Sequence, residues 1–183
     1  MLVGRGRERE RIDQLLAGAN SGRSGALVLR GEPGIGKSSL LRHAIEQATQ
    51  WKVLWATGIE TESELPFSGL AELFHPILDQ LDEIPAPQAA ALGGALAVGP
   101  PVVADPFTIY AATLSLIASA AERTPVLAVI DDAHWLDASS CDALLFAARR
   151  LHADRVVLLF AARTGERLLF DAPGVPELRL EGL

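Results

Sequence analysis

One short segment constrains the fold of this chain more than any other. It reads LRGEPGIGKSSLLRHA over residues 29–44, and it sets three glycines, a proline and a lysine between an apolar run and a run of helix-forming residues. Gly31, Gly36, Lys37 and Ser38 satisfy the pattern G-x-x-x-x-G-K-[ST]. Glycines let such a loop fold back so that its N–H groups point inward, and the helix that follows adds partial positive charge at its N-terminus. The segment therefore predicts a strand, a loop and a helix that together bind a polyphosphate.

The loop and the first helical turn supply the predicted binding residues. We expect the phosphates to be bound by Glu32, Pro33, Gly34, Ile35, Gly36, Lys37, Ser38 and Ser39. Lys37 would reach the outer phosphates, and the Ser38 hydroxyl would ligate a Mg²⁺ ion that those phosphates share. A fortuitous glycine-rich turn is the alternative, but the position of the motif after a predicted strand and before a predicted helix favours nucleotide binding.

A pair of aspartates follows a second apolar run. In PVLAVIDDAHWLD, residues 125–137, five apolar residues precede Asp131 and Asp132. A strand of this kind brings its last residues to the edge of the sheet where ligands bind in open α/β folds. We expect Asp131 to hold the water shell of the metal, and Asp132 to orient or deprotonate the attacking water. The alternative is a strand that ends in solvated aspartates.

A third apolar run, in VVLLFAARTGE, ends next to Arg163. An arginine at the edge of the sheet can contact the terminal phosphate of a triphosphate, although a surface arginine is the simpler alternative. Arg163 would complete a catalytic set with Lys37 and Asp132. His134 could help to place the water, but a structural histidine beside the site is the more ordinary interpretation. Thr57, at the end of another predicted strand, could be a polar switch residue.

Hydrophobic runs and helical stretches alternate along the chain, which predicts an α/β fold with a parallel sheet covered on both faces. Asp105 is expected to cap a helix that reaches Glu122. Residues 84–101, rich in proline and glycine, are expected to form a broken helical insertion. The other expected elements are helices over residues 7–17, 37–49, 67–81 and 139–151, a loop over 18–25, and strands over 26–30, 52–57, 125–130, 156–161 and 177–180.

Composition limits the class of protein further. The 183 residues, 49% of them hydrophobic, suffice for one well-covered domain. The formal net charge of -7 argues against a nucleic-acid clamp, which ordinarily carries a basic face. The single cysteine, Cys141, excludes an internal disulfide framework. The charged first residues do not resemble an export signal, and the longest uncharged stretch, residues 106–121, is too short to span a bilayer. We therefore expect a cytoplasmic location.

Several segments resemble a known family. LVGRGRE, GEPGIGKSSLLR, ELPFSGLAELFHPIL, VIDDAHWLDASS and LLFAAR are similar to the ATPase module of the large ATP-binding regulators of the LuxR family. These regulators are a branch of the signal-transduction ATPases with numerous domains (STAND), within the AAA-like P-loop group. The resemblance implies a three-layer P-loop NTPase with sheet order 5-1-4-3-2 and the Arg163 strand between the other two site strands.

The same resemblance implies ATP rather than GTP. A motif at the N-terminus of that class borders the adenine pocket, and its positions match Leu2, Val3, Gly4, Arg5 and Glu8 here. The expected cofactors are therefore ATP and Mg²⁺. Because Asp132 is one methylene shorter than the glutamate common in fast ATPases, we expect only slow hydrolysis of ATP to ADP and phosphate, in the service of regulation. Self-association through the ATPase module is a further implication.

Family members continue into a winged-helix lid, a helical-repeat region and a C-terminal helix-turn-helix. This chain stops at LRLEGL, about where the core sheet should end, so we expect a fragment or a very short relative. DNA binding would then belong to a C-terminal domain outside this segment. Two alternatives stay open: the same module attached to a nucleotide cyclase or protein kinase, and a small-molecule kinase, which the absence of lysine and arginine from residues 84–106 disfavours.

Overall fold

The computed structural model describes residues 4–165 and 170–182, and a five-stranded sheet forms its centre. The sheet has the order β2-β3-β4-β1-β5, and its strands are β1 (Gly25–Gly31), β2 (Lys52–Thr57), β3 (Val126–Asp131), β4 (Val156–Arg163) and β5 (Glu177–Leu180). Every neighbouring pair is parallel. This order is the predicted 5-1-4-3-2 read from the opposite edge, so the predicted fold class is confirmed, with β4 between β1 and β3.

Side chains alternate between two hydrophobic cores along the central strands. In β3, Val126, Ala128 and Ile130 lie in one core, whereas Leu127 and Val129 lie in the other. The alternation follows from strand geometry, because successive side chains point to opposite faces of a sheet. Since both faces are buried, both sets of side chains are apolar, which explains the uninterrupted apolar runs in the sequence.

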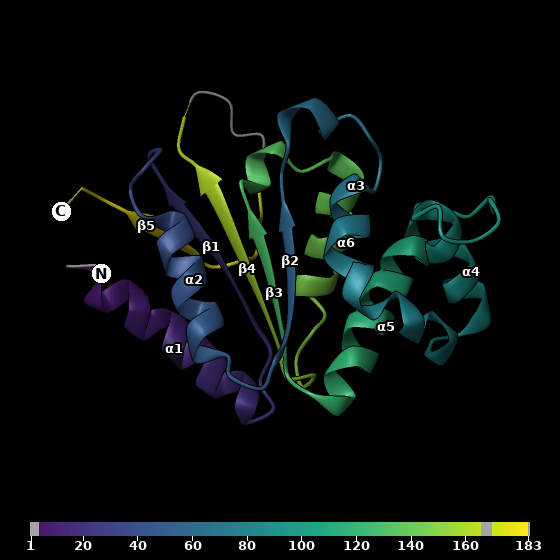
Figure 1. The fold of residues 1–183 in the computed structure, drawn as a ribbon, viewed down its shortest axis with the longest axis horizontal. Helices are drawn as coiled ribbons and strands as arrows, with labels where there is room; N and C mark the ends of the chain where they lie inside the picture. Colours follow the sequence, from purple (N-terminus) through teal and green to yellow (C-terminus); the bar gives the residue numbers. More distant parts are fainter. Residues whose placement is uncertain (1–3, 166–169, 183) are drawn as a thin grey trace.

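Helices cover both faces of the sheet (Figure 1). On one side lie α1 (Gly6–Asn20) and α2 (Lys37–Gln47), and on the other lie α3 (Ser68–Phe74), α5 (Pro106–Arg123) and α6 (Ala138–Ala148). The remaining helix, α4 (Ala86–Ala95), packs against α5 at the side of the molecule opposite α1. Three short 3-10 helices complete the described elements: η1 (Glu60–Glu62), η2 (His75–Glu83) and η3 (Ala133–Trp135).

The helix expected over residues 67–81 is divided in the structure. α3 ends at Phe74, and the chain continues as the 3-10 helix η2. Pro76 explains the division, because proline has no N–H to donate and its ring clashes with the preceding turn of an α-helix. Most of the other differences are shifts at element ends; for example, α1 extends to Asn20, α2 stops at Gln47, α6 spans Ala138–Ala148, and β4 continues to Arg163.

The cap predicted for the longest helix is present. The Asp105 carboxylate accepts hydrogen bonds from the Thr108 backbone N–H at 3.0 Å and from the Thr108 hydroxyl at 2.7 Å. Pro106 occupies the first helical position, where its missing N–H costs nothing. The predicted insertion contains one regular helix, α4, followed by a loop that leads to Asp105.

The parallel strands place all their carboxyl ends at the same edge of the sheet. The loops after β1, β3 and β4 are therefore neighbours, although they lie far apart in the sequence (Figure 1). This edge is where an open α/β sheet binds its ligands. In the part of the chain that the structure describes, no helix is long and apolar enough to cross a membrane.

Candidate functional site

The loop between β1 and α2 has the backbone conformation that its glycines permit. Gly34 and Gly36 have φ angles of 76° and 107°, in the left-handed region that residues with a Cβ adopt rarely. Gly36 is also the N-cap of α2, and within the described residues no side chain caps this helix end. The first amides of α2 are therefore available to an anion, and the helix adds partial positive charge there.

A cavity of about 310 Å³ lies above this helix end. Its volume falls at the lower end of the range of small-molecule sites, roughly 300–1,000 Å³. The lining residues come from the loop, from α2 and from the ends of β3 and β4: Pro33, Gly34, Gly36, Lys37, Ser38, Ser39, Arg42, Asp132 and Arg163. The tertiary structure thus brings together the three residues predicted for catalysis, Lys37, Asp132 and Arg163.

Lys37 lies inside the loop. Its side chain is buried, and its ammonium donates hydrogen bonds to the carbonyl oxygens of Gly31 and Glu32, both at 2.8 Å. Burial lowers the pKa of Lys37, while the neighbouring charge of Asp132 acts in the opposite direction. An ammonium has three donors, so these two bonds leave one for a phosphate oxygen.

The two aspartates at the end of β3 occupy different positions. Asp132 lines the cavity, whereas Asp131 closes the strand and accepts a hydrogen bond from the Asp132 backbone N–H at 2.9 Å. Burial lowers the pKa of Lys37, and the charge of Asp131 opposes this shift, as that of Asp132 does. Asp132 has a left-handed backbone with φ 45° and ψ 43°, which turns the chain sharply away from the strand.

Gly58 makes this turn possible. A Cβ at position 58 would lie 2.2 Å from the Asp132 carbonyl oxygen and 2.8 Å from the Leu136 backbone nitrogen. Both neighbours are backbone atoms, which cannot move away as the end of a flexible side chain can. The Gly58 N–H also donates to the Asp131 carbonyl oxygen at 2.9 Å, so the end of β2 supports the turn that carries Asp132.

Two basic side chains approach the Asp132 carboxylate. Arg163 Nε lies 3.8 Å from Asp132 Oδ1, and His134 Nε2 lies 3.9 Å from the same oxygen. The His134 ring is buried, and neither of its nitrogens has a hydrogen-bond partner among the described residues. Burial lowers the pKa of His134 below its ordinary value, which favours the neutral ring. Arg163 is half exposed and faces the cavity.

Glu32 connects the loop to the end of β4. Its carboxylate accepts a hydrogen bond from the Thr164 hydroxyl at 2.9 Å, and the Thr164 N–H donates to the Gly31 carbonyl oxygen at 3.3 Å. These contacts join the phosphate loop to the residue next to Arg163. Sequence reasoning missed Thr164, because nothing local relates residues 132 positions apart.

Arg42 is a second residue that sequence reasoning missed. It lines the cavity from α2, and its Nε donates weakly to the Ser38 carbonyl oxygen at 3.4 Å. Residues four apart share one face of a helix, so the spacing from Ser38 could have identified it. Among the remaining predicted residues, Glu32 and Ile35 are outside the set that lines the cavity in the described structure.

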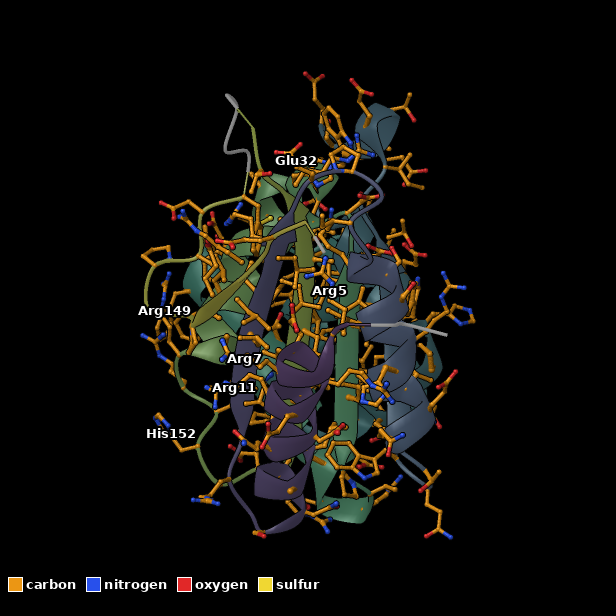
Figure 2. All side chains as sticks on the ribbon, turned by 90° about the vertical axis from the view of Figure 1, so that its left-hand side faces the viewer. Arg5, Arg7, Arg11, Glu32, Arg149 and His152 are labelled. Carbon is orange, nitrogen blue, oxygen red and sulfur yellow. The ribbon has the colours of Figure 1, made fainter. Side chains whose placement is uncertain are left out.

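The N-terminal motif lies beside the loop. Gly4 has a positive φ of 85°, and Arg5 donates to the Ile35 carbonyl oxygen at 3.1 Å and to the Glu181 carbonyl oxygen at 2.7 Å. Arg5 also pairs with Glu8 at 2.9 Å. Figure 2 shows Arg5 nearer to Glu32 than Arg7 and Arg11, which follow α1 away from the loop. Leu2 and Val3 lie outside the described residues.

Thr57, considered as a switch residue, is engaged away from the cavity. Its hydroxyl accepts a hydrogen bond from Trp55 Nε1 at 2.9 Å, and its backbone N–H donates to Glu72 Oε2 at 3.1 Å. Trp55 lies in β2 and Glu72 lies in α3, so neither partner belongs to the cavity.

The donor set fits a nucleotide with a metal. In the ranges 4–165 and 170–182, no group of three or more acidic, histidine or cysteine side chains could hold a metal ion by itself. A metal at this cavity would therefore take oxygen ligands from its anionic guest as well as from Ser38, with Asp131 close by. Uncapped helix amides, Lys37 and Arg163 supply the matching positive charge for polyphosphate.

Comparison with known proteins gives a family match and a related sequence. A family model described as the AAA ATPase domain matches residues 1–160. An uncharacterized protein of Rhizobium meliloti (strain 1021) is 27% identical over 199 residues, which cover 88% of this chain and 18% of that protein. The chain thus spans less than a fifth of the length of this relative.

Solved structures share the fold at low identity. Cdc6p from Pyrobaculum aerophilum has a TM-score of 0.60 at 20% identity, over 98% of this chain and 46% of that chain. A signal transduction ATPase with numerous domains (STAND) protein with a tetratricopeptide repeat sensor, from Pyrococcus horikoshii, has a TM-score of 0.55 at 23% identity, over 100% of this chain and 23% of that chain. At these identities the likeness concerns the fold alone.

Proposed function

Because this chain belongs to the AAA ATPase domain family, we propose that it binds ATP with Mg²⁺ and acts as a slowly hydrolysing regulatory switch. The observation that carries the proposal is that four side chains, those of Lys37, Ser38, Asp132 and Arg163, line one cavity. If Asp132 and Arg163 only ended their strands, nothing would require their opposite charges to face the N-terminus of α2.

In this proposal, each group of the site has its own role in binding the nucleotide. The amides at the start of α2 bind the phosphates, and the third donor of Lys37 reaches the outer ones. The Ser38 hydroxyl would ligate the metal, and Asp131 would hold its water shell. Bound Mg²⁺ supplies positive charge to the phosphate oxygens. Glu32, Pro33, Gly34, Ile35, Gly36 and Ser39 provide the backbone of the cradle.

Hydrolysis depends on Asp132 and Arg163. Asp132 orients the attacking water, and Arg163 stabilises charge on the terminal phosphate. The rate should be slow because the Asp132 carboxylate is one methylene shorter than a glutamate, so it reaches less far toward the attacking water.

ATP is preferred to GTP in this proposal because Gly4 and Arg5 lie beside the loop, where the resemblance puts the adenine. The contact from Arg5 to the Ile35 carbonyl supports an N-terminal motif that adjoins the site. Val3, outside the described residues, is part of the same proposal.

The regulatory role is that of a module in a LuxR-type transcriptional regulator. In support, the relatives that the chain matches are much longer, and one of them carries a repeat sensor according to its name. DNA binding would belong to another domain, and the ATPase module would self-associate in response to its nucleotide. The alternative is the same module with a nucleotide cyclase or protein kinase as its output, and the sequence of the complete parent gene distinguishes the two.

Calorimetry tests the binding proposal. The chain has two lysines, Lys37 in the cavity and Lys52 at the start of β2. Wild type and Lys52→Ala should bind ATP·Mg²⁺ with similar, micromolar or weaker affinity, whereas Lys37→Ala should bind far more weakly. Equal affinity in all three proteins would remove the hypothesis.

A further inference from the structure

The loop between α4 and α5 has an unusual surface. Residues 97–107 read AVGPPVVADPF, and all of them except Ala104 are exposed, with Asp105 as the one charged residue. Val103 is fully exposed, and Phe107 is 65% exposed. Surface loops ordinarily carry polar side chains, and contiguous exposed apolar residues mark interaction sites.

This loop is held in place. The Gly93 carbonyl oxygen accepts hydrogen bonds from the N–H groups of Val98 and Gly99, at 3.0 and 3.1 Å. At Gly94 the loop returns so close to α4 that an added Cβ would lie 3.0 Å from the Val102 backbone nitrogen. A surface that is ordered beforehand loses little conformational entropy when a partner binds.

A groove of about 420 Å³ runs between this loop, α4 and the end of η2. Its walls are mainly apolar, and they are formed by Leu81, Asp82, Ile84, Ala86, Ala89, Ala90, Gly93, Val98, Gly99, Pro100 and Val102. The groove shares no lining residue with the nucleotide cavity, and it can receive large apolar side chains. We call this groove and the exposed residues 97–107 the insertion surface.

Acidic side chains predominate around the insertion surface. Residues 53–122 contain nine carboxylates and no lysine or arginine. Asp79 and Asp82 are exposed on η2, and Asp105 is exposed at the start of α5. Glu83 is paired with Arg123, which follows this region. A partner with lysines or arginines beside its apolar anchors would be attracted, because complementary charge speeds and orients association.

We propose that the insertion surface docks a basic amphipathic helix of a partner protein. The apolar face of such a helix would enter the groove, as helices do in other groove-binding complexes, and its basic flanks would lie against Asp79, Asp82 and Asp105. The arginine-rich helix of this chain, α1, is unsuited to this role, because its apolar residues Ile12, Leu16 and Ala19 are buried in its own core. The α1 helix of this chain therefore does not supply the occupant.

Fluorescence anisotropy with a defined probe tests the proposal. The probe is a labelled peptide of about 18 residues, with leucines at helical spacing and lysines at the other positions, and its control carries glutamates in place of the lysines. The wild-type chain should bind the lysine peptide in the micromolar range and the glutamate peptide at least tenfold more weakly. Added salt should weaken the binding.

Matched variants locate the binding. Val98→Ser and Val103→Ser should each weaken the lysine peptide about fivefold to tenfold, because each removes apolar contact area. Leu65→Ser, at a comparably exposed apolar residue near η1, should leave the affinity unchanged. Lys37→Ala should also bind the peptide normally, so failure of the nucleotide proposal and failure of this one are distinguishable.

Two results would overturn the proposal. If all three serine variants bind the lysine peptide as the wild type does, the attraction is only one of net charge. If the wild-type chain forms dimers in sedimentation and Val103→Ser abolishes them, the insertion surface is an interface between copies of this chain.

Discussion

Asp132 shows at the scale of one residue how the site is built. A left-handed backbone at a residue with a Cβ costs of the order of 1 kcal/mol or more, and such strain gathers at functional positions. The surrounding contacts stabilise it: the Trp135 N–H donates to the Asp132 carbonyl oxygen at 2.8 Å, and Gly58 leaves room for that oxygen. The strained turn points the Asp132 carboxylate into the cavity beside Arg163.

Arg163 gives the sharpest prediction at this scale. If its guanidinium contacts the terminal phosphate, it stabilises ATP more than ADP, which lacks that group. A charge-assisted hydrogen bond contributes about 1.5 to 3 kcal/mol, so Arg163→Ala should lower the ATP/ADP preference by roughly tenfold or more. The affinity for ADP should hardly change. Titration of both nucleotides at fixed Mg²⁺ measures the preference.

Arg179→Ala is the matched control, because Arg179 is also an exposed strand arginine and pairs with Glu177 outside the cavity. It should leave both affinities unchanged. Parallel losses for ATP and ADP in Arg163→Ala would make Arg163 a structural residue, and no loss for either would make it a surface one.

At the scale of elements, Asp137 joins two helices. It is the N-cap of α6, where its carboxylate accepts a hydrogen bond from the Ser140 N–H at 2.9 Å. The same carboxylate accepts hydrogen bonds from the backbone N–H groups of Phe67 and Gly69 at 2.8 and 3.1 Å. One buried side chain therefore fixes the start of α3 against the start of α6.

Asp137→Ala should destabilise the fold strongly. The change leaves three backbone N–H groups without their acceptor in a buried place, so the free energy of unfolding should fall by about 3 kcal/mol or more. Urea denaturation measures the loss. Asp105→Ala removes a similar cap from an exposed position and should cost clearly less. Equal losses in the two variants would show that Asp137 is only an ordinary helix cap.

At the scale of the whole molecule, the open position of the nucleotide cavity determines the expected rate of hydrolysis. The nucleotide cavity is an open one at the edge of the sheet, and Asp132 and Arg163 at its rim are both partly exposed. Water that enters such a site weakens electrostatic stabilisation of the transition state. Phosphate release from ATP·Mg²⁺ should therefore stay close to background. A release assay that shows many turnovers per second would reverse the switch proposal in favour of an enzyme.

The sequence by itself determined those features that contiguous residues encode. The phosphate loop is one run of eight positions, and its glycine spacing alone predicts the strand, turn and helix that the structure contains. The central strands were predictable because burial on both faces demands apolar residues at every position. Asp132 and Arg163 followed from the ends of those strands, since parallel strands share one edge.

Only the tertiary structure decided what distant residues do together. Glu32 meets Thr164, Arg5 meets the Glu181 carbonyl, and Asp137 meets the start of α3, over separations of 132, 176 and about 70 residues. No local pattern specifies such pairs, because each depends on how the loops pack after the sheet has formed. The sequence predicted a broken helical insertion over residues 84–101, and only the tertiary structure shows that most of the apolar residues just before α5 are exposed. The spacing of apolar residues shows which side chains are favourable to bury, whereas tertiary packing determines which of them are buried.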